Sequence, residues 1–218
     1  MSKLKPILFS TPMVQAILDG RKTQTRRICT SSLKSDCDIH KSESIRECHY
    51  NDTGWSEWGN GACRCQNTTK PKYKIGDILY VKETWSLTRG FFEGDEKILY
   101  KADSTDEDAK AFHWKPSLFM PQAYARLYLK VTNVRVERLQ DISEEDAIAE
   151  GIKRIGDGWK DYDFKDNSKY NYRYLRAIDS YKSLWDSINK KEPEKQWDLN
   201  PYVFVYEFER VARPGGMA

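Results

Sequence analysis

The sequence predicts a mixed α+β fold in which helices surround a small β-barrel. Residues 127–136 alternate apolar and polar side chains with one break, and residues 202–208 place an aromatic side chain at every second position, as strands with one buried face do. Segments 13–18 and 174–188 have helical spacing of apolar residues, without the regular strand–helix alternation of a doubly wound sheet. The chain has 218 residues, a length typical of one domain, so we expect residues 1–218 to form a single domain.

Composition excludes a disordered chain and a membrane span. Hydrophobic residues make up 39% of the chain and aromatic residues 13%, which is enough to build a core. The longest apolar runs, such as residues 78–81, are much shorter than a membrane-crossing helix. The first residues carry charge and no long apolar stretch follows them, which speaks against a secretory signal. We therefore expect a cytoplasmic protein with no membrane partner.

The first expected elements are a short strand and a short helix. Residues 7–9 are apolar, and Thr11 and Pro12 suit the N-cap and the first position of a helix. Apolar residues within 13–18 give this helix a buried face, and Gly20 suits its end because glycine adopts a positive φ angle readily. The basic run 21–27 therefore begins where the helix stops, on a loop or at the start of a strand.

Further strands are expected after residue 74. Residues 78–85 and 97–101 are rich in β-forming side chains. The alternation over 127–136 breaks near Thr132 and Asn133, which indicates a bulge or a turn. We expect the segments 78–85, 124–136 and 202–208 to share one barrel-like sheet.

Two helices are expected in the second half of the chain. Ser143 caps a short helix with Asp146 in the reciprocal capping position, and Gly151 stands just past its end. A longer amphipathic helix is predicted by a 4, 3, 4, 3 spacing of apolar residues, which are Tyr174, Ile178, Tyr181, Trp185 and Ile188.

A long insertion at about 29–74 separates the two halves and lacks any sustained period. It holds all five cysteines of the chain, and Cys37 and His40 have a spacing that zinc ligands use. Cys63 and Cys65 are closer together than usual ligands, and the cysteine count is odd, so we expect thiols and no metal, with a structural zinc as the alternative. We expect residues 30–70 to be peripheral and their removal to leave the remainder folded.

Charge is distributed unevenly, although the net charge is only +3. Residues 1–30 carry six basic side chains and one acidic side chain, whereas residues 137–150 carry six acidic side chains and one basic side chain. The first segment would attract a polyanion and the second would repel it. The alternative, favoured by charge alone, is that the two segments face each other or solvent.

Lys22, Thr25 and Glu150 are the candidate catalytic residues. Lys22 stands three residues before Thr25, and a lysine made neutral by burial and by neighbouring cations can take a proton from a hydroxyl group. The alternative is a solvated or phosphate-binding basic loop. Glu150 lies at the C-terminal end of a helix, where the helix dipole disfavours a carboxylate. A residue that stands where local preferences disfavour it is a mild indication of function.

The sequence resembles the ASCH-domain proteins, especially the larger ones carried by phages and prophages. The resemblance covers most of the chain outside the insertion, in the segments 5–10, 17–27, 76–85, 114–117, 120–121, 136–152 and 200–208. It implies a PUA-like β-barrel with surrounding helices and a cleft for RNA or a nucleoside.

Small ASCH proteins include amidohydrolases that remove the acetyl group from N(4)-acetylcytidine. Their motif around the catalytic lysine and threonine matches Lys22 and Thr25, and their glutamate matches Glu150. The resemblance thus implies that Thr25 attacks an amide carbonyl, Lys22 acts as base and Glu150 holds the lysine. The alternatives are an RNA- or nucleotide-binding module, with or without ribonuclease activity, and a phage accessory protein that does no chemistry.

We expect substrate-binding residues beside the catalytic group at the mouth of the barrel. They are Arg21, Arg26, Arg27, Glu83 and Trp85. Glu83 and Trp85 are expected to share one face of a strand, where they offer a hydrogen-bonding group and a stacking surface for a base. The expected partner is a modified nucleoside or RNA, and no catalytic cofactor is expected.

Overall fold

The computed structural model describes residues 4–29, 48–51, 54–57, 71–88, 96–105, 107–163 and 173–215. Its main element is a five-stranded sheet with the order β1-β5-β8-β12-β2. These strands span Lys5–Leu8 (β1), Ile78–Lys82 (β5), Tyr128–Arg138 (β8), Tyr202–Val211 (β12) and Gln24–Ile28 (β2). The β1–β5 pair is parallel and the other pairs are antiparallel.

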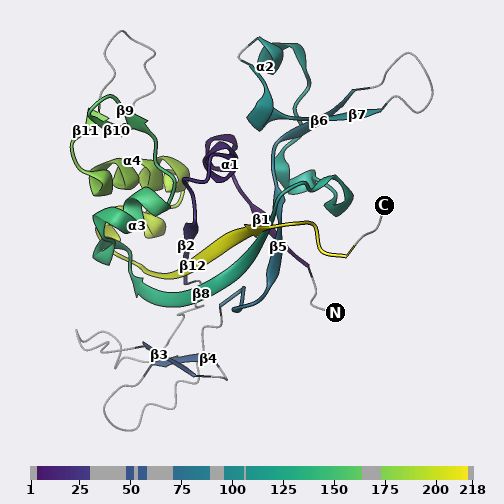
Figure 1. The fold of residues 1–218 in the computed structure, drawn as a ribbon. Coiled ribbons are helices and arrows are strands. Elements are labelled where there is room, and N and C mark those ends of the chain that lie inside the picture. The colour runs from purple at the N-terminus through teal and green to yellow at the C-terminus, as the bar shows by residue number, and fades with distance from the viewer. Residues whose placement is uncertain are drawn as a thin grey trace.

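The long strands β8 and β12 form the curved centre of this sheet (Figure 1). Glu207 pairs with Asn133 and Phe208 pairs with Val131, so Thr132 is an extra residue on β8. The break in alternation is therefore a β-bulge, which bends a strand and increases its twist.

The prediction of a mixed α+β fold is confirmed, and so is the sharing of one sheet by β5, β8 and β12. The sheet is open and not a closed barrel, because β1 and β2 stand at its two edges and no pairing joins them within the described residues. The expected strand 78–85 is interrupted, since β5 ends at Lys82 and Trp85 begins a strand of a separate sheet.

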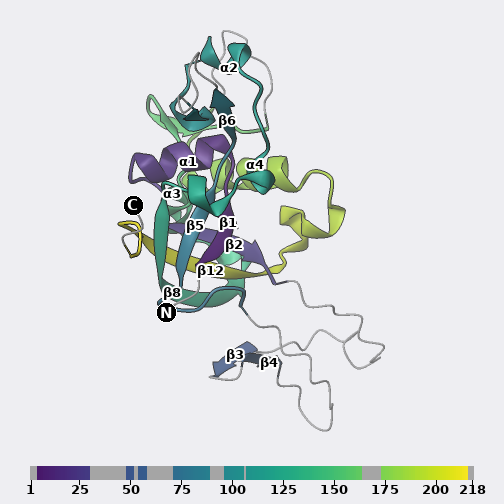
Figure 2. The ribbon, with the colours of Figure 1, turned by 90° about the vertical axis from the view of Figure 1, so that its right-hand side faces the viewer.

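Three helices lie together on one side of the sheet, as the two views show (Figure 1, Figure 2). They span Thr11–Leu18 (α1), Glu144–Ala149 (α3) and Ala177–Asn189 (α4), and a short helix, α2, spans Asp108–Ala111. Their apolar faces share a core with the sheet, for example Val14 of α1, Ala147 of α3 and Leu129 of β8. The first helix begins one residue earlier than expected, at Thr11, with Ser10 at the N-cap.

Smaller sheets and turns complete the described part of the chain. A pair is formed by β6 (Trp85–Thr88) and β7 (Lys97–Tyr100), and a small sheet by β9 (Arg154–Ile155), β10 (Gly158–Lys160) and β11 (Arg173–Tyr174). Single 3₁₀ turns span Lys101–Asp103, Ser117–Phe119, Gln122–Tyr124, Leu139–Asp141, Pro193–Lys195 and Trp197–Leu199.

Within the insertion, the backbone of β3 (Cys48–Asn51) pairs with that of β4 (Gly54–Glu57). The proposed zinc ligands Cys37, His40, Cys63 and Cys65 lie outside the described residues, as does most of the segment 30–70. Among the helices that are described, none has the length and apolar character needed to cross a membrane.

Candidate functional site

A cavity of about 590 Å³ lies between the edge strand β2, the start of α1, the end of α3 and one face of α4. Its volume is within the range of small-molecule sites. The predicted residues Lys22, Thr25, Arg26, Arg27 and Glu150 all line it. The structure thus brings together the three candidate catalytic residues, although 125 positions of sequence separate Thr25 from Glu150.

Backbone hydrogen bonds fix the chain around Lys22. The amide nitrogen of Lys22 donates to the carbonyl oxygen of Ala16 at 3.0 Å, so the residue is tied to α1. The amide of Thr23 donates to the carbonyl of Ala149 at 2.9 Å, which joins this segment to the end of α3. The carbonyl of Thr23 accepts from the amide of Phe208 at 2.8 Å, so the main sheet holds the same residue. Lys22 therefore projects from a backbone restrained on three sides.

Glu150 holds the amino group of Lys22 in two directions. The Lys22 Nζ atom lies 2.9 Å from Glu150 Oε2 and 2.7 Å from the Glu150 carbonyl oxygen. Both side chains are almost completely buried, with 2% and 4% of their surface exposed. A neutral lysine amine keeps two N–H donors and has one lone pair. Both contacts with Glu150 can therefore persist when Lys22 loses a proton, and the lone pair then remains for another group.

Burial lowers the pKa of Lys22 from the ordinary lysine value of 10.5. Glu150 acts in the opposite direction, since its charge and hydrogen bond favour the ammonium form, but it does not offset the burial. The cations Arg27 and Arg26 also lower the pKa of Lys22. The environment of Lys22 thus favours the neutral amine more than solvent does for an exposed lysine.

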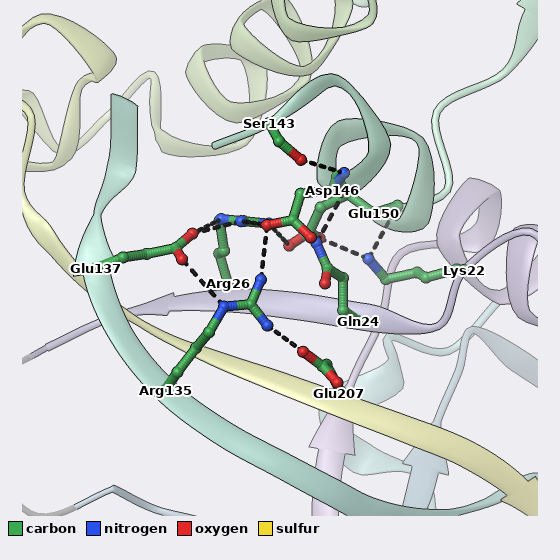
Figure 3. A network of polar contacts seen from close by, with 9 residues as sticks. All are labelled: Lys22, Gln24, Arg26, Arg135, Glu137, Ser143, Asp146, Glu150 and Glu207. Atoms are coloured by element: carbon green, nitrogen blue, oxygen red, sulfur yellow. Dashed lines mark hydrogen bonds and ion pairs between the residues drawn. The ribbon is translucent and has the colours of Figure 1, made fainter. Parts of the chain in front are cut away.

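Arg26 has its whole guanidinium group committed to carboxylates (Figure 3). Its NH1 atom lies 3.1 Å from Glu150 Oε1, and its NH2 atom lies 2.7 Å from Asp146 Oδ2. Its Nε atom donates to Glu137 Oε1 at 3.0 Å. Burial alone would lower the pKa of Arg26, but Glu150, Tyr181 and Glu137 raise it by more than burial lowers it, so the guanidinium stays charged.

The two oppositely charged segments of the sequence therefore face each other. Lys22 and Arg26 of the basic segment pair with Glu137, Asp146 and Glu150 of the acidic segment. Arg26 lines the cavity, but its side chain has no exposed surface and each of its three guanidinium nitrogens contacts a carboxylate. Arg26 holds the Glu150 oxygen that Lys22 does not use.

Thr25 and Arg27 are two further β2 residues at the cavity. Thr25 is buried, and its backbone pairs with Tyr206 of β12. Arg27 is exposed, and its NH2 atom donates to the carbonyl oxygen of Leu8 at 2.8 Å. Its guanidinium carbon lies 5.4 Å from the centre of the Phe9 ring. Arg27 is thus the cation of this segment that remains accessible at the cavity edge.

Three of the predicted binding residues do not line this cavity. Arg21 turns away to bond Asp19 at 2.8 Å and the Gly151 carbonyl at 2.8 Å, so it supports the turn after Glu150. Glu83 is buried, and both of its carboxylate oxygens bond Arg126 at 2.9 and 3.0 Å.

Trp85 packs in a second apolar cluster, with Lys115 4.8 Å from its ring centre. The expected shared face of Glu83 and Trp85 does not exist, because the chain leaves the main sheet after Lys82.

Aromatic residues that the sequence analysis did not assign to the site form part of its walls. Tyr181 and Trp185 of α4 line the cavity together with Phe9. Burial raises the pKa of the Tyr181 hydroxyl well above 10.0, so it stays protonated. In the sequence, the helical stripe that contains Tyr181 and Trp185 indicated only a buried core face. No separate sequence signal marked them. Ile188, which continues the stripe, also lines the cavity and is 62% exposed in the structure.

Gly151 permits the close approach of α1 and Lys22. Its φ angle is +88°, and an added Cβ atom would lie 2.7 Å from Lys22 Cβ and 2.8 Å from Ala16 Cβ. We expect Gly151→Ala to lower the free energy of unfolding by about 2–4 kcal/mol, through backbone strain and overpacking together. Urea unfolding followed by tryptophan fluorescence measures this loss.

The matched control is Gly20→Ala, because Gly20 also has a positive φ angle of +74° but has no atom within 4 Å of the added Cβ. It should lose only the strain component, about 1–2 kcal/mol. Equal losses in the two variants would contradict the steric part of this explanation.

Comparison of the chain with protein-family models, with curated proteins and with solved structures finds no match in any of the three. The assignment of a function therefore depends on the geometry of the site and on the resemblance described above.

Proposed function

We propose that this protein is an amidohydrolase of the ASCH type, which removes the acyl group from an N(4)-acylated cytidine or a similar nucleoside. The observation that carries the proposal is the buried Lys22–Glu150 pair at a nucleoside-sized cavity that Thr25 also lines. A buried lysine with a lowered pKa is suited to act as a base near neutral pH.

In the first step the Thr25 hydroxyl oxygen attacks the carbonyl carbon of the substrate amide. Neutral Lys22 accepts the hydroxyl proton on its lone pair while its two N–H groups stay on Glu150. The tetrahedral intermediate then collapses, the bond to the amine nitrogen breaks, and the ammonium group of Lys22 returns the proton to that nitrogen. The products of this step are the free amine and an ester on Thr25.

In the second step water hydrolyses the ester on Thr25. Lys22 takes a proton from the attacking water and delivers it to the departing Thr25 oxygen, so that carboxylic acid and free enzyme result. Glu150 stabilises the transient ammonium group in both steps, and Arg26 keeps the Glu150 carboxylate in place.

The cavity walls favour a nucleoside over a long polyanion. Phe9, Tyr181 and Trp185 supply aromatic surface for a planar base. Three cations of the basic run 21–27 line the cavity. Lys22 and Arg26 are already paired with carboxylates, and of the three only Arg27 is exposed. A strand with several phosphates needs a longer track of available cations.

For the fold, we infer that the curved sheet is an open form of the PUA-like barrel that the resemblance implies. The order β1-β5-β8-β12-β2, with helices on one side, supports this assignment. An experimental structure that pairs β1 and β2 in a continuous barrel would agree with it, and a parallel α/β array would exclude it.

The direct test is hydrolysis of N(4)-acetylcytidine by the purified full-length chain, followed by chromatography of cytidine. The same assay is run with other N(4)-acyl groups and with short acetylated and unmodified RNA. We expect cytidine release, with little dependence on salt because few phosphates are bound. Cleavage of the RNA backbone, or binding of RNA that weakens steeply with salt and no deacylation, would contradict the proposal.

The rate of deacylation should rise with pH and level off below pH 10.5. Only neutral Lys22 accepts a proton, so lowering the pH through the pKa of Lys22 removes the active form, about tenfold per pH unit. Burial lowers that pKa from 10.5, and the acidic limb therefore lies below this value. A pH profile of kcat/KM measures the limb, and a parent rate that shows no acidic limb at any pH at which the protein stays folded would rule out this role.

A further inference from the structure

A second cavity, of about 690 Å³, lies on another face of helix α1. Met13 faces the first cavity, whereas Pro12, Gln15 and Leu18 line the second. The other walls come from the 3₁₀ turn Lys101–Asp103, from the chain after Gly151 and from the β9–β10 hairpin. The proposed deacylation does not use this cavity.

The lining of the second cavity carries an excess of positive charge. Its basic residues are Arg21, Lys153, Arg154 and Lys160, and its acidic residues are Asp19 and Asp103. Both carboxylates already have cationic partners, because Asp19 pairs with Arg21 and Asp103 pairs with Arg126. Within the described part of the chain, no ion pair is formed by Lys153, Arg154 or Lys160.

The backbone around these three cations is fixed by the hairpin. The amide of Lys160 donates to the carbonyl oxygen of Lys153 at 2.9 Å, and the amide of Lys153 donates to the Tyr162 hydroxyl at 2.9 Å. Arg154 pairs with Trp159 across β9 and β10. All three residues line the same cavity, so three like charges gather around one concave surface, where a bound anion would relieve their repulsion.

The shape and the remaining lining indicate which anion fits. The volume exceeds what a single phosphate group fills, and Pro12, Leu18, Ala102 and the Tyr162 ring provide surface for a less polar part. Three cations that gather in one cavity match a compact group of phosphates more closely than a strand of phosphates spread over a surface.

We propose that this second cavity binds a nucleotide through its diphosphate or triphosphate group, with Lys153, Arg154 and Lys160 on the phosphates. The site is separate from the Lys22–Glu150 cavity and does not depend on the deacylation proposed there.

The test is calorimetric titration of the full-length chain with ADP, inorganic pyrophosphate, cytidine and a short single-stranded RNA. ADP and pyrophosphate should bind to the parent protein. The triple variant Lys153→Gln, Arg154→Gln, Lys160→Gln should bind ADP about 10³-fold more weakly, because each of the three lost charge-assisted contacts is worth about a factor of ten.

The matched control removes three exposed cations that lie outside both cavities, in the variant Lys97→Gln, Lys110→Gln, Arg210→Gln. It changes the net charge equally and should leave ADP binding unchanged. Arg27→Gln, at the first cavity, should also leave it unchanged. Thermal melting checks that each variant is folded.

The proposal is wrong if the triple variant binds ADP as the parent does, or if the control variant weakens binding equally. It is also wrong if the parent binds neither ADP nor pyrophosphate, or binds RNA alone. None of these results bears on deacylation, which is measured separately with N(4)-acetylcytidine.

Discussion

Replacing Lys22 by methionine should lower kcat for an N(4)-acylated cytidine by about 10²–10⁴-fold, the usual contribution of a general base. Methionine is similar to lysine in length and tolerates burial, but it offers neither a lone pair that accepts a proton nor a donor for Glu150. Initial rates of cytidine release at several pH values measure the effect. The residual rate should also lose the acidic limb that Lys22 produces in the parent protein.

Thr25 supplies the control that separates chemistry from structure. Thr25→Val keeps the shape of the side chain without the hydroxyl group and should be as severe as Lys22→Met. Thr25→Ser keeps the hydroxyl group and should retain much of the rate. If Lys22→Met hydrolyses the substrate as fast as the parent, or if Thr25→Val and Thr25→Ser behave alike, the proposed mechanism fails.

The parts of the site that depend on local signals were predictable from the sequence. Gly20 ends α1 with a positive φ angle, and the Ser143 hydroxyl accepts a hydrogen bond from the Asp146 amide at the start of α3. Gly151 ends the same helix with a positive φ angle. These residues fix where α1 and α3 end, just before Lys22 and at Glu150. Helix ends are determined mainly by side chains close in sequence.

The roles of the neighbouring arginines were not predictable, because they depend on contacts between distant segments. Arg26 and Arg27 are adjacent in sequence, yet one is fully buried among carboxylates and the other is exposed. Alternation on an edge strand separates them, but only the packing of α3 against β2 determines which side meets Glu150. The sequence showed that opposite charges existed and not which of them pair.

The chain path near Glu83 also lacked a local signal. Residues 78–85 are rich in β-forming side chains and contain neither glycine nor proline, so a continuous strand was the simplest interpretation. In the structure Trp85 pairs with Tyr100 of β7 and bridges to Lys115, partners that lie 15 and 30 residues further along the chain. Such nonlocal pairing overrides the local pattern and removes Glu83 and Trp85 from the cavity.

Arg26→Gln is expected to destabilise the protein by about 3–5 kcal/mol, because removal of one partner from a buried ion pair leaves an uncompensated charge. Glu150 would keep only Lys22, and Glu137 and Asp146 would lose the partner that they share. Urea unfolding of parent and variant at neutral pH measures the difference.

Arg135→Gln is the matched control, since Arg135 also contacts Glu137 and Asp146 but is 30% exposed and makes no contact with Glu150. Its loss should be about 1 kcal/mol or less, as for partly solvated pairs. Equal losses in the two variants would mean that burial of the Arg26 network adds no stability beyond that of a partly exposed ion pair.

Acidification provides an independent check on the Arg26 network. Burial alone would raise the pKa of the Asp146 carboxyl, but the hydrogen bond and charge of Arg26, together with Arg135, lower it below the ordinary value of 3.8. A carboxyl with a lowered pKa stabilises the folded state above its unfolded pKa and loses that contribution as the pH falls through the folded value. The stability difference between the parent and Arg26→Gln should therefore narrow as the pH falls below 3.8. A difference that stays constant or widens over that range would show that Arg26 does not act through the ionised Asp146.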